Sequence, residues 1–215
     1  MSSVSDALLG WFQIACLLFF LALVVGRTIS LRVRERTDPI TLSLSKGFLG
    51  LMELSLFIGV NLWAFAVLAY SLPLESRPLP WLLGTPLIDA PPAKIAGAIL
   101  IVVAFVLFIS ALRALGSSWR LGIQEDLQGD LVTAGVYAFT RNPIYLFFDL
   151  YFVGTFLVNG ALFFLLFAAL AAANLHYQIL QEEKFLASVH GQVYQRYCAS
   201  TPRYVSWRSK ARHRE

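Results

Sequence analysis

The chain has 215 residues, of which 58% are hydrophobic and 14% are charged, and its net charge is +4. Soluble domains are about 45–50% apolar and about 25% charged, so a soluble core of this size could not bury so much apolar surface. The composition therefore excludes a disordered chain, a disulfide scaffold and a simple soluble enzyme, and it predicts an integral membrane protein.

Apolar runs of the length that spans a bilayer, about 20 residues, recur along the chain. The first three cover residues 8–26, 47–70 and 95–112. A fourth run, from Pro143 to about Leu175, is too long for one span, and the turn dipeptide Asn159-Gly160 divides it into helices over 144–158 and 161–181. The sequence thus predicts an all-α polytopic membrane protein with five transmembrane helices in a single membrane domain (residues 1–215). It further predicts a short hairpin of the fourth and fifth helices and a cytoplasmic C-terminal helix.

The basic residues are distributed unevenly between the predicted loops. Fifteen of the 17 Lys and Arg residues fall in the first loop, the third loop and the C-terminal tail, whereas only Arg77 and Lys94 fall on the other side. Because basic residues concentrate on the cytoplasmic side of membrane proteins, we expect the N-terminus outside and the C-terminus in the cytoplasm. Segments 113–142 and 182–206 are then the cytoplasmic catalytic segments, and residues 207–215 form a basic tail.

Two of these segments should meet at the membrane surface. Pro143 suits the first turn of a helix, with Asn142 as its N-cap. The predicted hairpin returns the chain to the side where it began, and so it brings Arg141–Tyr145 close to Glu182-Glu183. Adjacent glutamates on a helix diverge by about 100°, so one can face a pocket while the other pairs elsewhere. Taken singly, these residues also fit a helix cap, interfacial anchors and a solvated helix face.

The motifs resemble those of the integral membrane methyltransferases that include isoprenylcysteine carboxyl methyltransferase and phospholipid N-methyltransferase. The family signature is RHPxY followed some 25–38 residues later by EE. Here it reads Arg141-Asn-Pro-Ile-Tyr145, 36 residues, then Glu182-Glu183, with Asn142 in place of the family's His. Three flanking motifs also resemble the family: Gly116-Ser-Ser-Trp119, Leu131-Val-Thr-Ala-Gly-Val-Tyr137, and the tail Gly191-x-x-Tyr194-x-x-Tyr197.

The resemblance implies S-adenosylmethionine as cofactor and a lipophilic or lipidated acceptor in contact with membrane lipids. By position in the motifs, with His176 added because it lies near the cytoplasmic end of the last span, the candidate cofactor-binding residues are Gly135, Tyr137, Asn142, Pro143, Tyr145, His176, Glu182 and Glu183. No Gly-rich phosphate-binding loop follows a strand, and no cluster of His and Cys residues predicts a metal site. Nucleic-acid binding has no support beyond charge, and the sequence leaves the oligomeric state open.

The acceptor is first expected to be an isoprenylcysteine-like carboxylate, which a cation would orient. Arg113, Arg141 and Trp119 are the candidate catalytic residues. Arg113 is preferred among the arginines as that cation, and a snorkelling interfacial role for Arg113 stays open. Asp149 and Arg203 are candidate substrate-binding residues, Asp149 because ionisable residues inside spans are costly and tend to be functional.

Other functions fit parts of the same pattern. A phospholipid amine or a small thiol could be the acceptor instead. An NADPH-dependent sterol-type reductase would share the C-terminal hairpin, although the paired glutamates at this spacing favour a methyltransferase. A non-enzymatic transporter or scaffold explains the spans and Glu53 but leaves the clustered motifs as coincidence.

Overall fold

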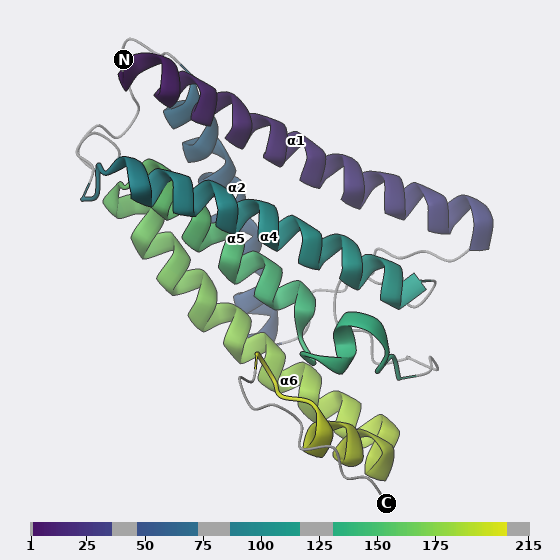
Figure 1. Ribbon diagram of the computed structural model, residues 1–215. Helices are drawn as coiled ribbons and strands as arrows, with labels where there is room; N and C mark the ends of the chain where they lie inside the picture. Colours follow the sequence, from purple (N-terminus) through teal and green to yellow (C-terminus); the bar gives the residue numbers. More distant parts are fainter. Residues whose placement is uncertain (1, 36–46, 73–86, 117–130, 206–215) are drawn as a thin grey trace, which may run out of the picture.

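The computed structural model describes residues 2–35, 47–72, 87–116 and 131–205 (Figure 1). In this part of the chain every element is helical, as predicted. Its long helices are α1 (Ser2–Glu35), α2 (Phe48–Ser71), α4 (Pro91–Leu115), α5 (Pro143–Asn159) and α6 (Leu162–Ser200). A short 3₁₀ helix, η2 (Gly135–Ala138), precedes α5.

Four of these helices, α1, α2, α4 and α6, are long and apolar enough to cross a membrane. Large apolar side chains on their outer surfaces are open to the surroundings, for example Leu18 (60% exposed), Phe57 (65%) and Val106 (61%). Such a surface is stable only against lipid or another apolar partner, so the helices indicate an integral membrane protein. Helix α5, at 17 residues, is apolar but shorter, and five crossings remain a prediction.

The chain reverses between α5 and α6 at Gly160. This residue closes the C-terminal end of α5 with a left-handed backbone (φ 68°), a conformation that glycine adopts without steric cost. The Gly160 carbonyl also accepts a hydrogen bond from the Leu87 backbone N–H at 2.7 Å. The turn therefore fixes where α5 ends and connects it to the segment that leads into α4.

Helix α6 continues well past residue 181, where the sequence predicted the end of the last span. Its backbone breaks at Gly191 (φ 52°, ψ −123°), and beyond that residue the chain turns back. Figure 1 shows the yellow C-terminal segment returning along α6. We call residues Thr201–Val205 the strap, because they lie against the start of α5 and the middle of α6.

Aromatic side chains of α4 and α5 pack against one another within the core. Phe147 stacks on Phe108 with ring centroids 4.4 Å apart, and it packs edge-on against Phe105. From α2, Trp63 packs edge-on against Tyr151 and donates its indole N–H to the Thr155 hydroxyl at 3.1 Å. This packing fixes the orientation of α5 and so of the residues at its N-terminal end.

Helices α4 and α5 approach each other through two glycines. A Cβ atom added to Gly97 would lie 2.7 Å from the Gly154 carbonyl oxygen and 2.9 Å from the Val158 backbone nitrogen. Small residues at such crossings let helix backbones approach closely within a membrane. The close approach depends on the absence of both side chains.

Gly97→Ala should therefore destabilise the protein by about 1–3 kcal/mol, the usual cost of overpacking a filled interface. The matched control is Gly26→Ala, because a Cβ atom there meets nothing within 4 Å and alanine favours a helix by roughly 0.5–1 kcal/mol. Thermal unfolding of the two variants in detergent checks this. Equal midpoints for both variants would contradict the proposed tight crossing.

Candidate functional site

The predicted motif residues meet at the end of the bundle where α5 begins. Pro143 occupies the first turn of α5, as predicted, and Asn142 holds the N-cap position. The Asn142 side chain does not cap the helix, however. Its amide donates instead to the Glu183 carboxylate at 3.2 Å and to the Arg203 carbonyl at 3.1 Å. Asn142 therefore connects α5, α6 and the strap.

Glu183 is the centre of this site. Its Oε1 accepts hydrogen bonds from Arg141 Nη2 at 2.9 Å and Nε at 3.2 Å, in addition to the Asn142 amide. Its Oε2 accepts from Arg203 Nη2 at 2.8 Å and Nε at 3.1 Å. The side chains of Glu183 and Arg141 are each 10% exposed, whereas that of Arg203 is 36% exposed. Both carboxylate oxygens are thus occupied by protein donors, and this bonding raises the pKa of Arg203.

Arg141 also holds the backbone of the strap. Its Nη1 donates to the Thr201 carbonyl at 2.7 Å and to the Cys198 carbonyl at 3.3 Å, and its backbone N–H donates to the Pro202 carbonyl at 3.0 Å. The Thr140 hydroxyl donates to the Arg203 carbonyl at 3.1 Å. The bond to Cys198 satisfies a carbonyl in the last turn of α6, and the other bonds hold the backbone of the strap.

Glu182 points to a different set of neighbours. Its carboxylate accepts a hydrogen bond from the Tyr145 hydroxyl of α5. On the same stripe of α6, at spacings of four residues, lie Gln178 and Asn174, and the Gln178 amide donates to Asn174 Oδ1 at 2.7 Å. Glu53 of α2 is near enough to interact electrostatically with Tyr145. The two adjacent glutamates therefore face different surroundings, as the 100° step between them requires.

The η2 segment forms a further wall. Gly135 begins η2 with a positive φ of 64°, and the Tyr137 carbonyl accepts a hydrogen bond from the Tyr197 hydroxyl at 2.6 Å. Burial raises the pKa of the Tyr137 phenol far above its usual value, so this hydroxyl stays protonated. This wall packs against the last turns of α6.

A third group of polar side chains lies closer to the middle of the bundle. The Tyr204 hydroxyl of the strap lies 2.7 Å from His176 Nδ1, and the two rings stack with centroids 6.0 Å apart. Burial raises the pKa of Tyr204, and the Asp149 carboxylate of α5 raises it further. Asp149, His176 and Tyr204 thus come together from three separate segments.

Two of the predicted catalytic residues are not among these contacts. The Arg113 side chain is exposed in the last turn of α4, and Trp119 lies outside the described residues. Sequence reasoning gave no role to Thr140, Tyr197, Tyr204 or Glu53. The tail motif and the intramembrane charge were available signals for Tyr197 and Glu53, but the Thr140 and Tyr204 contacts depend on the path of the strap.

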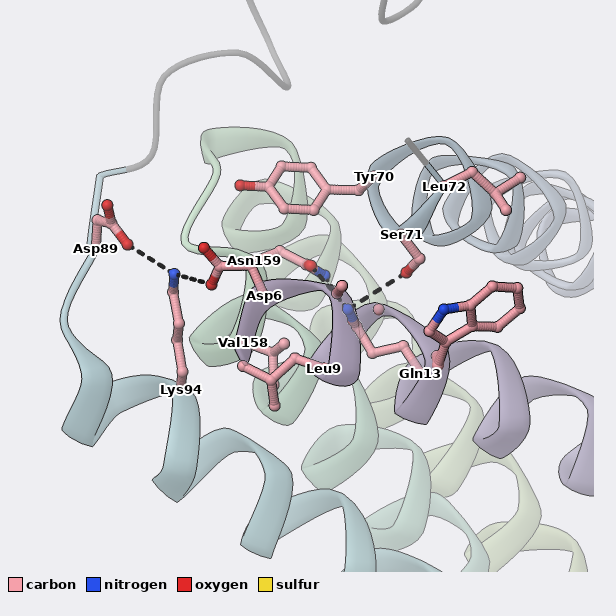
Figure 2. Close-up of a pocket in the computed structure, with 13 residues that line it drawn as sticks. Asp6, Leu9, Gln13, Tyr70, Ser71, Leu72, Asp89, Lys94, Val158 and Asn159 are labelled. Atoms are coloured by element: carbon pink, nitrogen blue, oxygen red, sulfur yellow. Dashed lines mark hydrogen bonds and ion pairs between the residues drawn. The ribbon is translucent and has the colours of Figure 1, made fainter. Parts of the chain in front are cut away.

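A separate cavity of about 360 Å³ opens at the opposite end of the bundle (Figure 2). At its mouth Lys94 bridges Asp6 and Asp89, each at 2.8 Å. At its base Gln13 and Asn159 exchange amide hydrogen bonds at 3.0 and 2.7 Å. Exposed ion pairs contribute little to stability, whereas the buried amide pair connects α1 to the end of α5.

The family comparison applies to the segment that carries this geometry. Residues 92–193 match the phospholipid methyltransferase family. This match confirms the family resemblance predicted from the motifs, and it implies a membrane methyltransferase. The matched segment contains α4 from Pro92 onward, η2, α5 and α6 up to Val193, whereas α1, α2 and the strap lie outside it. No curated protein matches the chain in sequence.

Proposed function

We propose that the protein is an S-adenosylmethionine-dependent methyltransferase that acts on a lipophilic acceptor at the cytoplasmic face of a membrane, with its N-terminus outside. The observation that carries this proposal is the meeting of the Arg141–Tyr145 motif with both glutamates, through the Arg141–Glu183, Asn142–Glu183 and Tyr145–Glu182 contacts. These are the residues that the family resemblance assigns to the cofactor.

The chemistry of the donor set fits this cofactor. Carboxylates bind ammonium groups and ribose hydroxyls through charge-assisted hydrogen bonds. Among the described residues, Tyr145 is the one hydrogen-bond donor to Glu182. Both carboxylate oxygens of Glu183, by contrast, accept hydrogen bonds from arginines. We therefore assign cofactor binding to Glu182 and Tyr145, and we assign Glu183 to holding the strap. When bound, S-adenosylmethionine supplies an electrophilic methyl group on a sulfonium.

The remaining predicted residues are proposed as walls of this site. Gly135, Tyr137, Asn142 and Pro143 line the side of η2 and the start of α5, and His176 lies deeper on α6. Positioning of the acceptor against the cofactor would contribute more to this reaction than acid–base chemistry. The rigid aromatic packing below α5 supplies that positioning.

The arginines near the site bear on whether the methyl acceptor is a carboxylate or an amine. An isoprenylcysteine-like carboxylate, the first expectation, requires a cation, yet Arg141 and Arg203 are both bonded to Glu183. Arg113 is the proposed alternative cation, at the exposed end of α4. A phospholipid amine needs no such cation, and the family match favours it as the acceptor. Small-thiol methylation has no comparable support.

Titration calorimetry with S-adenosylmethionine on the detergent-solubilised protein tests the proposal. We expect saturable one-site binding, followed by transfer of labelled methyl from the cofactor to a lipid extract. Base-stable label would indicate an amine or thioether, and base-labile label an ester. Absence of cofactor binding, or hydride transfer from NADPH in place of methyl transfer, would refute the proposed function.

A further inference from the structure

Asp149 carries a polar atom that the described part of the chain does not satisfy. Its Oδ1 is buried and has no hydrogen-bond partner among the described residues. A buried carboxylate oxygen without a donor is unfavourable, since it has lost its hydration and gained nothing in exchange. Such an atom points to a hydrogen-bond donor on a bound ligand.

The neighbours of Asp149 among the described residues make their hydrogen bonds elsewhere. The Tyr204 hydroxyl, which is near enough to interact electrostatically with Asp149, bonds with His176 Nδ1 at 2.7 Å. The neighbouring Arg203 guanidinium donates to Glu183. His176 and Glu183 therefore anchor the strap beside Asp149, while none of the residues that the structure describes donates to Oδ1.

The depth of Asp149 matches the position of an acceptor that enters from the bilayer. It lies four residues beyond Tyr145 on α5, about 6 Å deeper along the helix axis. Tyr145 and Glu182 form the proposed cofactor side, so Asp149 lies between that side and the apolar middle of the bundle. Ionisable residues at such depth are rare, and they usually mark a substrate path.

We propose that Asp149 binds the methyl acceptor and that its carboxylate accepts a hydrogen bond from an acceptor amine. This inference rests on the proposed function. A carboxylate acceptor would place a second negative charge beside Oδ1 in a low-dielectric environment, which is strongly unfavourable. An amine supplies the missing N–H donor and, when protonated, a compensating charge.

The test compares Asp149→Asn with Asp89→Asn in methyl-transfer assays at saturating cofactor. Asp89 undergoes the same chemical change at the opposite end of the bundle, where its side chain is 64% exposed. The probes are vesicles that contain phosphatidylethanolamine and an N-acetylated prenylcysteine. We expect Asp149→Asn to raise the KM for the amine lipid about tenfold or more, with kcat changed less than threefold. Asp89→Asn should leave both constants unchanged.

Calorimetry with S-adenosylmethionine distinguishes the acceptor amine from the cofactor's own ammonium group as the donor to Asp149. The inference predicts that Asp149→Asn leaves the cofactor Kd within about twofold of the wild-type value and does not worsen the KM for the prenylcysteine. If Asp149→Asn weakens cofactor binding by the same factor by which it raises the amine KM, Asp149 binds the cofactor instead. That result would overturn the inference. An unchanged amine KM would overturn the inference as well. The proposed function would still stand in that case, provided that the wild-type protein binds the cofactor. If the wild-type protein binds no cofactor, both fail.

Discussion

Replacing Glu183 with Gln should lower the free energy of unfolding by roughly 3 kcal/mol, the lower end of the cost of breaking a buried ion pair. The change removes the negative charge that Arg141 and Arg203 share and leaves the Arg141 guanidinium, with its side chain 10% exposed, without a counter-charge. The Arg203 side chain is 36% exposed, so solvent screens its ion pair with Glu183 and reduces the loss of stability. Thermal unfolding in detergent measures the effect.

The same variant should release the strap. Cys198 lies in the last turns of α6, and its carbonyl accepts a hydrogen bond from Arg141, so its thiol reports on local opening. In a Cys16→Ser background, maleimide should modify Cys198 faster in Glu183→Gln than in the parent protein. Unchanged alkylation together with an unchanged unfolding midpoint would show that Glu183 does not hold the strap.

Glu182→Gln should have the opposite pattern, with a large effect on cofactor binding and a small one on stability. The amide keeps an acceptor for the Tyr145 hydroxyl, so the contact between α5 and α6 survives. It loses the charge that we assign to the cofactor, and hydrogen bonds to charged groups contribute about 1.5–3 kcal/mol. We expect the Kd for S-adenosylmethionine to rise about 10- to 150-fold in calorimetry.

The two glutamate variants are controls for each other, because they make the same chemical change one residue apart. If Glu182→Gln destabilises the protein as much as Glu183→Gln does, the division of roles is wrong. If Glu183→Gln weakens cofactor binding more than Glu182→Gln while the protein remains folded, the two assignments must be exchanged. Tyr145→Phe should reproduce part of the Glu182→Gln effect, since it removes the hydroxyl that orients the carboxylate.

Much of the architecture could be predicted from the distribution of apolar residues. Each of the five predicted apolar runs lies within one long helix of the described residues, to within one residue at its start, because burial of apolar side chains in lipid and backbone hydrogen bonding both favour helices there. Helix ends were predicted less well, since α1 and α6 continue beyond their apolar runs. The lipid sets the length of a span, whereas a helix ends only where its backbone is interrupted, as at Gly191.

The sequence by itself determined the membrane class, the helical fold and the resemblance to the phospholipid methyltransferase family, and it predicted that Arg141–Tyr145 would lie near Glu182-Glu183. Only the tertiary structure decided that Glu183 pairs with Arg141 and Arg203 while Glu182 faces Tyr145. Helical periodicity gives the angle between two adjacent side chains, but the packing of neighbouring helices decides what each one faces. The strap was unpredictable for a related reason. One left-handed glycine reverses the chain, and the reversal places Tyr204 beside Asp149 and His176.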